Sequence, residues 1–162
     1  MNKKILIISG IILFLDQVVK TVVETFIKLN SSIVVFKNFF SITYTNNYGA
    51  AWSILNNQQW LLIIITFIAL GIIYRYMNTF KDNTRNKIAF ALLFGGIAGN
   101  LLDRLFLGYV RDFIAFKIFG YNAPIFNISD MAIFFGVMLL IIAIFKGEDN
   151  GSSSNRKPNK GR

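Results

Sequence analysis

The sequence contains neither cysteine nor histidine among its 162 residues. Their absence excludes disulfides, thiolate nucleophiles, serine–histidine–aspartate triads and histidine-based zinc sites. Because there is no thiol, the composition gives no indication of the redox compartment. The hydrolytic mechanisms that remain include a pair of carboxylates and a serine–lysine pair.

Acidic residues are also scarce. Eight acidic residues stand against 17 basic ones, for a net charge of +9, and no charged residue lies between Lys37 and Arg75. A basic balance can indicate nucleic-acid binding. Here the lysines and arginines cluster at the ends of apolar segments, which indicates a membrane protein with no nucleic-acid partner.

Four apolar segments approach the length of about 20 residues that a membrane-spanning helix needs. They cover residues 5–26, 59–74, 88–107 and 128–145. The predicted fold is therefore an all-α membrane protein with four transmembrane helices and a small β-rich extracytoplasmic subdomain. The N-terminal segment has the basic start of a signal peptide but no small-residue cleavage site, so we expect a retained signal-anchor helix.

The basic residues predict the orientation of this four-span topology. Eleven of them fall at the N-terminus, between spans two and three, and in the tail, whereas five fall on the other side. Basic loops favour the cytoplasm, so both termini are expected there and the loop after span three is expected outside. We expect a bacterial cytoplasmic membrane protein.

The domain boundaries follow from composition. Residues 1–146 are expected to form the membrane domain, and residues 147–162 form a polar, basic tail that we expect to be disordered and cytoplasmic. Within the membrane domain, residues 30–57 are expected to form a β-rich insertion. Residues 32–45 are rich in β-branched and aromatic side chains, which is typical of short strands. Gly95 and Gly99 are spaced for close helix packing, or have no special role.

Four acidic residues lie within or beside the apolar spans, where an ionisable group costs a few kcal/mol or more and indicates function. Each also has a structural interpretation. Asp16 can pair with the lysine four residues later, Asp103 can pair with the next residue or with a neighbouring helix, and Asp130 can cap a helix. Asp112 can form a solvated ion pair with Arg111.

The pair formed by Asp112 and Asp130 favours catalysis, because the two residues flank one loop at the ends of adjacent spans. Two carboxylates a few ångströms apart cannot both ionise readily, so one keeps a proton. The protonated group can donate to a carbonyl oxygen while the other takes a proton from water, as in aspartic proteases. Serine–lysine catalysis through Lys20 is less favoured, since no serine has a clear spatial relation to it.

Five sequence blocks, taken in order, resemble those of bacterial lipoprotein signal peptidases, also called signal peptidase II, which are intramembrane aspartic proteases. The blocks are "DQVVK", "NNYGAAWS", "GGIAGNLLDRL", "GYVRDF" and "FNISD". The resemblance covers about residues 5–145. It implies that Asp112 and Asp130 are the catalytic pair.

Further roles are implied by the same resemblance. Substrate-binding positions are Asn47, Asn100, Arg104 and Asn127. Supporting positions are Asp16, Lys20, Asp103, Gly49 and Gly99. Two residues depart from the common pattern: Trp52 stands where phenylalanine is usual, and Ser129, where alanine is usual, is able to add a hydrogen bond beside Asp130.

The resemblance also implies the activity. Such enzymes remove signal peptides from prolipoproteins whose cysteine carries a diacylglyceryl group, and they cut on the amino side of that cysteine. The expected partners are these lipid-modified substrates and membrane lipid; the expected state is a monomer without cofactor or metal. Two alternatives remain: a small transporter or channel that uses the carboxylates as a proton or cation relay, and a noncatalytic membrane scaffold.

Overall fold

The computed structural model describes residues 2–50 and 54–149. The predicted disordered tail, apart from residues 147–149, lies outside this range, and so does Trp52. Nothing in the structure therefore bears on residue 52 or on residues 150–162, whereas the described Glu148 contacts Asn83 and Arg85.

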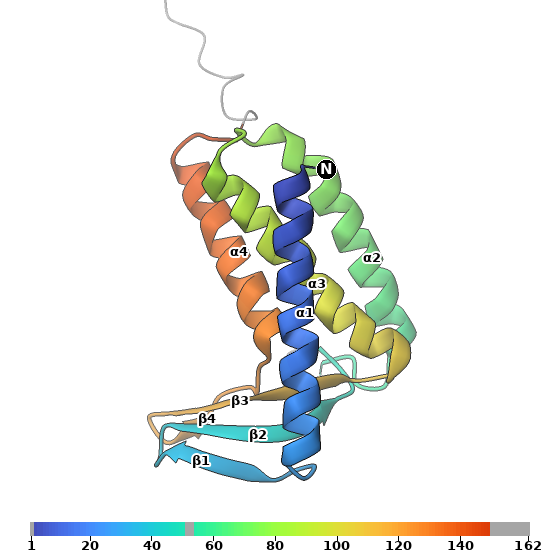
Figure 1. Ribbon diagram of the computed structural model, residues 1–162, viewed down its shortest axis with the longest axis vertical. Coiled ribbons are helices and arrows are strands. Elements are labelled where there is room, and N and C mark those ends of the chain that lie inside the picture. The colour runs from blue at the N-terminus through green and yellow to red at the C-terminus, as the bar shows by residue number, and fades with distance from the viewer. Residues whose placement is uncertain (1, 51–53, 150–162) are drawn as a thin grey trace, which may run out of the picture.

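Within the described residues, four helices are long and apolar enough to cross a membrane, as the sequence predicted. Their bounds are α1 (Lys3–Phe26), α2 (Gln59–Tyr76), α3 (Thr84–Phe106) and α4 (Ile128–Phe145), with a short 3₁₀ turn, η2 (Met77–Thr79), after α2. Helix α3 is the most buried of the four and passes behind α1, between α2 and α4 (Figure 1). The polar residues of α3 are therefore enclosed by the other helices.

Apolar side chains cover the outside of this bundle. Phe14 on α1, Trp60 on α2 and Phe134 on α4 are each more than half exposed. Helices that are hydrophobic on all sides are stable where lipid replaces water as the solvent. The bundle therefore has the surface of a membrane protein, with its polar side chains gathered at its ends and inside.

Small residues let the helices approach closely, as predicted for Gly95 and Gly99. A Cβ on Gly95 would lie 2.8 Å from the Ser9 carbonyl oxygen on α1, and one on Gly99 would meet Asp16. Gly96 has the same role toward α4, since its Cβ would lie 2.5 Å from the Ser129 carbonyl oxygen. Contacts of this kind drive helix association in lipid, where the hydrophobic effect is weak.

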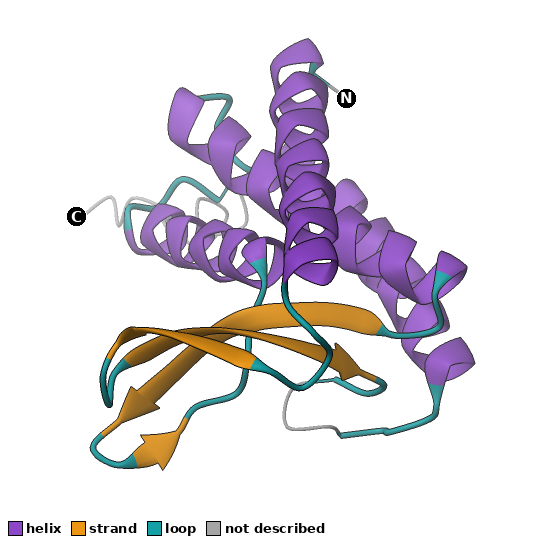
Figure 2. Cartoon of the chain, turned by 60° about the horizontal axis from the view of Figure 1, so that its bottom comes forward, coloured by secondary structure: helices purple, strands orange, loops and turns teal. Residues whose placement is uncertain are grey.

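A four-stranded antiparallel sheet closes one end of the bundle (Figure 2). Among the described residues its order is β1 (Ser32–Phe36), β2 (Phe40–Asn47), β3 (Val110–Ile118) and β4 (Tyr121–Asn122). The sequence predicted strands in the first half only; β3 and β4 lie outside the expected β-rich segment 30–57. The sheet thus joins the first loop to the segment between α3 and α4.

The sheet is fixed to α1 by a small apolar cluster of Val23, Ile27, Tyr44 and Phe113. The Tyr44 hydroxyl also donates to Glu24, and the buried setting beside this carboxylate raises the pKa of Tyr44. Strand β3 is paired to β2 so that Asp112 lies opposite Thr45. This register brings Asp112 to the start of α4.

The close contact at Gly96 gives a test of the helix packing. We expect Gly96→Ala to lower the free energy of unfolding in detergent micelles by about 1–3 kcal/mol, because the added methyl group overpacks the α3–α4 interface. Thermal unfolding followed by circular dichroism measures the change. Gly71→Ala is the matched control, since nothing lies within 4 Å of its Cβ position. Equal melting temperatures for the two variants would contradict this packing.

Candidate active site

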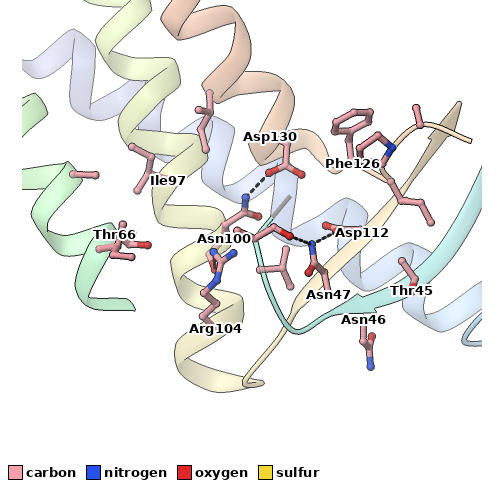
Figure 3. Close-up of a pocket in the computed structure, with 18 residues that line it drawn as sticks. Thr45, Asn46, Asn47, Thr66, Ile97, Asn100, Arg104, Asp112, Phe126 and Asp130 are labelled. Atoms are coloured by element: carbon pink, nitrogen blue, oxygen red, sulfur yellow. Dashed lines mark hydrogen bonds between the residues drawn. The ribbon is translucent and has the colours of Figure 1, made fainter. Parts of the chain in front are cut away.

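A cavity of about 590 Å³ lies between the sheet and helices α2, α3 and α4 (Figure 3). Its polar lining includes both aspartates of the predicted pair and three of the four predicted substrate-binding residues: Asn47, Asn100, Arg104, Asp112 and Asp130. The wall contributed by Ile65, Thr66 and Ala69 of α2 was not anticipated from the sequence, because Ile65 and Ala69 resemble the lipid-facing residues around them and the Thr66 hydroxyl is satisfied within its own helix.

Asp112 is held on β3 by two side-chain amides and is only 3% exposed. Asn47 Nδ2 donates to Oδ2 at 2.9 Å, and Asn127 Nδ2 donates to Oδ1 at 2.7 Å. The predicted solvated ion pair of Asp112 with Arg111 is wrong. Successive side chains of a strand point to opposite faces, and Arg111 instead binds Asp103 and Glu24.

Asp130 lies in the first turn of α4, where it completes a capping box with Asn127. Its Oδ2 accepts from the Asn127 backbone N–H at 3.1 Å, and its Oδ1 accepts from Asn100 Nδ2 at 2.7 Å. The capping interpretation of the sequence is therefore correct. It does not exclude catalysis, because the same carboxyl group also lines the cavity.

Asn127 joins the two carboxyl groups. Its Oδ1 accepts from the Asp130 backbone N–H at 2.9 Å, which directs its Nδ2 toward Asp112. Asn47 is oriented in the same way, since its Oδ1 accepts from the Gly49 N–H at 2.9 Å. Both amides are thus fixed as donors to Asp112 by contacts with the backbone.

Electrostatics distinguish Asp112 from an ordinary carboxylate. Burial, and then repulsion from the neighbouring Asp130, raise the pKa of Asp112 to about 7, although the amides of Asn47 and Asn127 oppose this rise. Burial disfavours the charged form of an acid, and a nearby like charge adds to the effect. Asp112 can therefore hold or release a proton near neutral pH.

Arg104 reaches the same cavity from the last turns of α3. Its Nη2 donates to the Gly49 carbonyl oxygen at 3.2 Å, and its Nη1 donates to the Asn100 carbonyl oxygen at 3.4 Å. Its buried Nε has no hydrogen-bond partner among the described residues. The predicted pairing of Asp103 with Arg104 does not occur, so this guanidinium is available to a ligand in the cavity.

Behind the cavity lies a buried network centred on Lys20, which is fully buried. Its Nζ contacts Asp16 at 2.8 Å, Asp103 at 3.2 Å and Asn100 Oδ1 at 3.0 Å. The contact with Asn100 directs the amide Nδ2 of that residue toward Asp130. The i,i+4 pairing of Asp16 with Lys20 is confirmed, and so is the pairing of Asp103 with a neighbouring helix.

Three further residues, Gln17, Glu24 and Arg111, belong to this network and were not among the predicted site residues. Gln17 contacts both Asp103 and Arg111, and Arg111 Nη1 binds Glu24 at 3.0 Å. The signal for Gln17 was its polarity within an apolar span. Arg111 lies inside strand β3, which was not predicted, so nothing in the sequence indicated that its side chain contacts Asp103 and Glu24.

Ser129 does not add a hydrogen bond beside Asp130. Its backbone N–H donates to Asp16 Oδ1 at 2.9 Å, whereas its buried hydroxyl has no hydrogen-bond partner among the described residues. The hydroxyl lies where a Cβ of Gly99 would be. Gly99 is therefore needed to bring α1, α3 and the start of α4 together.

Taken together, the fold and the cavity define a membrane-embedded protein with two amide-bound carboxyl groups at one end of a four-helix bundle. Among the described residues, no three acidic side chains are grouped so as to hold a metal ion. The sequence pattern of the family described as Signal peptidase (SPase) II matches residues 8–146.

Known proteins agree with this match. The chain is 40% identical, over 146 residues and 90% of each chain, to lipoprotein signal peptidases of Staphylococcus aureus strains bovine RF122 / ET3-1 and JH9. A solved bacterial membrane enzyme superposes with a TM-score of 0.80 at 38% identity, covering 98% of this chain and 94% of its own. Another gives 0.77 at 40% identity, covering 88% and 92%. The chain belongs to the signal peptidase II family.

The buried position of Lys20 leads to a stability prediction. We expect Lys20→Met to lower the free energy of unfolding by about 3–5 kcal/mol, because it leaves the buried Asp16 carboxylate without a cation and removes one of the two cations that contact Asp103. Chemical unfolding in micelles measures this change. Lys28→Met, at an exposed position, removes the same charge and serves as the control. A Lys20→Met protein as stable as the control would contradict the network.

Proposed function

We propose that the protein is an aspartic endopeptidase that removes signal peptides from diacylglyceryl-modified prolipoproteins. It cuts on the amino side of the lipidated cysteine, with Asp112 and Asp130 as the catalytic residues. Membership of the signal peptidase II family supports the activity and the substrate. The observation that carries the catalytic assignment is Asn127, which binds both carboxyl groups in one cavity.

In the proposed reaction, one aspartate removes a proton from water while the other donates a hydrogen bond or a proton to the peptide carbonyl group. The tetrahedral intermediate collapses when a proton reaches the leaving amine. Because the two groups interact, their titration belongs to the pair and not to either residue alone. The amides of Asn47, Asn100 and Asn127 keep the pair in place during this proton exchange.

Substrate recognition uses the other polar groups of the cavity. Arg104 holds the substrate backbone, together with the cavity-lining Asn47 and Asn100, since unpaired peptide groups are costly near lipid. Asn127, which we expected to bind substrate, is fully buried and does not line the cavity, so its role is to hold the two carboxyl groups. The wall that Ile65 and Ala69 of α2 provide accommodates the apolar signal peptide. The lipid chains of the substrate stay in the bilayer beside the helices.

The proposed orientation places the sheet outside the bacterial cytoplasmic membrane and both termini in the cytoplasm. Lys3, Lys4, Lys81 and Lys87 belong to the bundle end opposite the sheet, where the chain begins and α2 leads into α3 (Figure 1). Positive residues favour the cytoplasmic side. The dyad then lies near the outer interface, where the cleavage site of a membrane-inserted substrate is found.

Residues 1–146 act as one catalytic membrane domain, with residues 147–162 as a cytoplasmic tail. The protein works as a monomer, without metal, cofactor or nucleic acid. The relay alternative is not favoured, because Asp112 and Asp130 lie at one end of the bundle and Asp16 is enclosed with Lys20. No described chain of carboxylates crosses the membrane.

Removing either aspartate tests the reaction. We expect Asp112→Asn and Asp130→Asn each to reduce cleavage of a lipid-modified prolipoprotein by about 100-fold or more, because each removes a proton-transferring group. Purified protein and a gel-mobility assay measure this loss. Asp82→Asn, in the exposed loop at the other end, should cleave normally. Near-normal cleavage by either dyad variant would contradict the assignment.

The pKa of Asp112 predicts the pH dependence. The dyad needs one proton, and Asp112, whose pKa is raised to about 7, loses its proton as the pH rises through that value. We therefore expect kcat/KM to fall above about pH 7 and to decline with a slope approaching one decade per pH unit. Initial rates on a lipidated peptide measure the profile. A flat profile up to about pH 9 would contradict this coupling.

A further inference from the structure

Two neighbouring turns of the sheet expose large apolar side chains that none of the roles above uses. The turns are residues 36–40, which join β1 to β2, and residues 118–121, which join β3 to β4; we call them the hairpin tips. Both tips lie at the same end of the sheet, because Phe40 pairs with Phe116. The side chains that are at least half exposed there are Phe36, Phe39, Ile118, Phe119 and Tyr121.

The turn that holds Phe119 indicates that its ring contacts something outside the chain. Phe119 and Gly120 form a two-residue loop between β3 and β4, with φ values of 49° and 86°. A loop with positive φ at both positions favours asparagine followed by glycine, and a bulky side chain is strained there. In the other tip, Asn38 takes the position with positive φ. The Phe119 side chain is also 96% exposed, so contacts with the described residues do not offset the strain.

The charge at this end of the sheet is only positive. Lys37 and Lys117 are exposed and form no ion pair with any described residue. The sequence has no acidic residue between positions 25 and 81 or between positions 113 and 129. Aromatic rings beside lysines are typical of the membrane–water interface, where the rings lie among the headgroups and the ammonium groups reach the phosphates. The hairpin tips have this composition.

The position of the sheet also matches the interface. Helix α1 has 24 residues, or about 36 Å at the rise of an α-helix, whereas the hydrocarbon core of a bilayer is about 30 Å thick. Its last turn, where Phe26 is exposed, therefore reaches the headgroup region, and the apolar cluster described above fixes the sheet to this end of α1. The hairpin tips project sideways from there, away from α1 and beyond the start of α4 (Figure 1). They overhang the lipid that the exposed Phe134 of α4 contacts.

We propose that the hairpin tips are a membrane anchor, which inserts the rings of Phe36, Phe119 and Tyr121 among the lipids of the leaflet on the dyad side. Lys37 and Lys117 lie at the lipid phosphates. A second copy of the chain suits the tips less well, because two tips in contact would bring their lysines together without an acidic partner. Since β3 carries the dyad strand, the anchor holds that strand at the depth at which α4 begins. The anchor does not depend on the proposed peptidase activity.

The test measures the depth of the tips in a bilayer. Because the chain has no cysteine, a spin label on one introduced cysteine reports a single position. Phe36→Cys and Phe119→Cys are labelled in nanodiscs of equal parts phosphatidylcholine and phosphatidylglycerol. The readout is the ratio of label collisions with oxygen, which concentrates in lipid, to collisions with a nickel chelate, which stays in water. We expect a ratio several-fold above that of the exposed loop variant Asp82→Cys and close to that of Phe14→Cys on the lipid-facing side of α1.

Two results would overturn the anchor. A collision ratio at both tip positions equal to that of Asp82→Cys would place the tips in water. Few collisions with either reagent, together with dipolar broadening between labelled copies in one disc, would show that a second copy of the chain covers the tips. Neither result depends on whether the protein cleaves a lipoprotein, so the proposed function stands or fails separately.

A second variant removes the ring without disturbing the turn. Phe119→Asn places the favoured residue in the loop, so the melting temperature in micelles should not fall. The collision ratio of a label at position 36 should nevertheless drop several-fold in nanodiscs, because the tips lose their most exposed ring. Phe145→Asn removes a ring that is 87% exposed at the other end of the bundle and should leave this ratio unchanged. An unchanged ratio in Phe119→Asn, or a lower melting temperature, would show that the ring is not an anchor.

Discussion

The structure depends on one electrostatic requirement. Carboxylates that are buried in the apolar bundle need a cation or hydrogen-bond donors beside them. Lys20 satisfies this requirement for Asp16 and shares it with Arg111 at Asp103, and both carboxylates are buried. Unpaired, either carboxylate would cost several kcal/mol. The same lysine binds Asn100, so the network that stabilises the helices also orients a donor to Asp130. Stability and site geometry therefore share one set of contacts.

The site itself is held by asparagines whose orientations are set by the backbone. Asn127 caps α4 and contacts both carboxyl groups, and Asn47 is fixed by the turn at Gly49. Burial and the nearby Asp130 raise the pKa of Asp112 to about 7, against the lowering effect of its amide donors Asn47 and Asn127. Proton exchange between two aspartates is one of the few hydrolytic chemistries available to a chain without histidine or cysteine.

The sequence predicted the four helices well, because runs such as residues 59–74 have no other stable environment than lipid. It also predicted that Asp112 and Asp130 lie near each other, and both line one cavity; charge beside such apolar runs is what singled them out. Strand β3 was missed because its stretch of apolar residues beside Arg111 and Asp112 reads as the end of a span. The pairing of Arg111 with Asp103 was missed as a consequence, because the face on which the Arg111 side chain lies is known only once the strand is known.

The coupling of the two aspartates is tested most directly by infrared titration of the Asp112 carboxyl group, identified as the band that disappears in Asp112→Asn. The account predicts a pKa of about 7 for Asp112, falling when Asp130→Asn removes the neighbouring charge. An ordinary carboxyl pKa, unchanged by Asp130→Asn, would show that the two groups do not interact and would contradict the account.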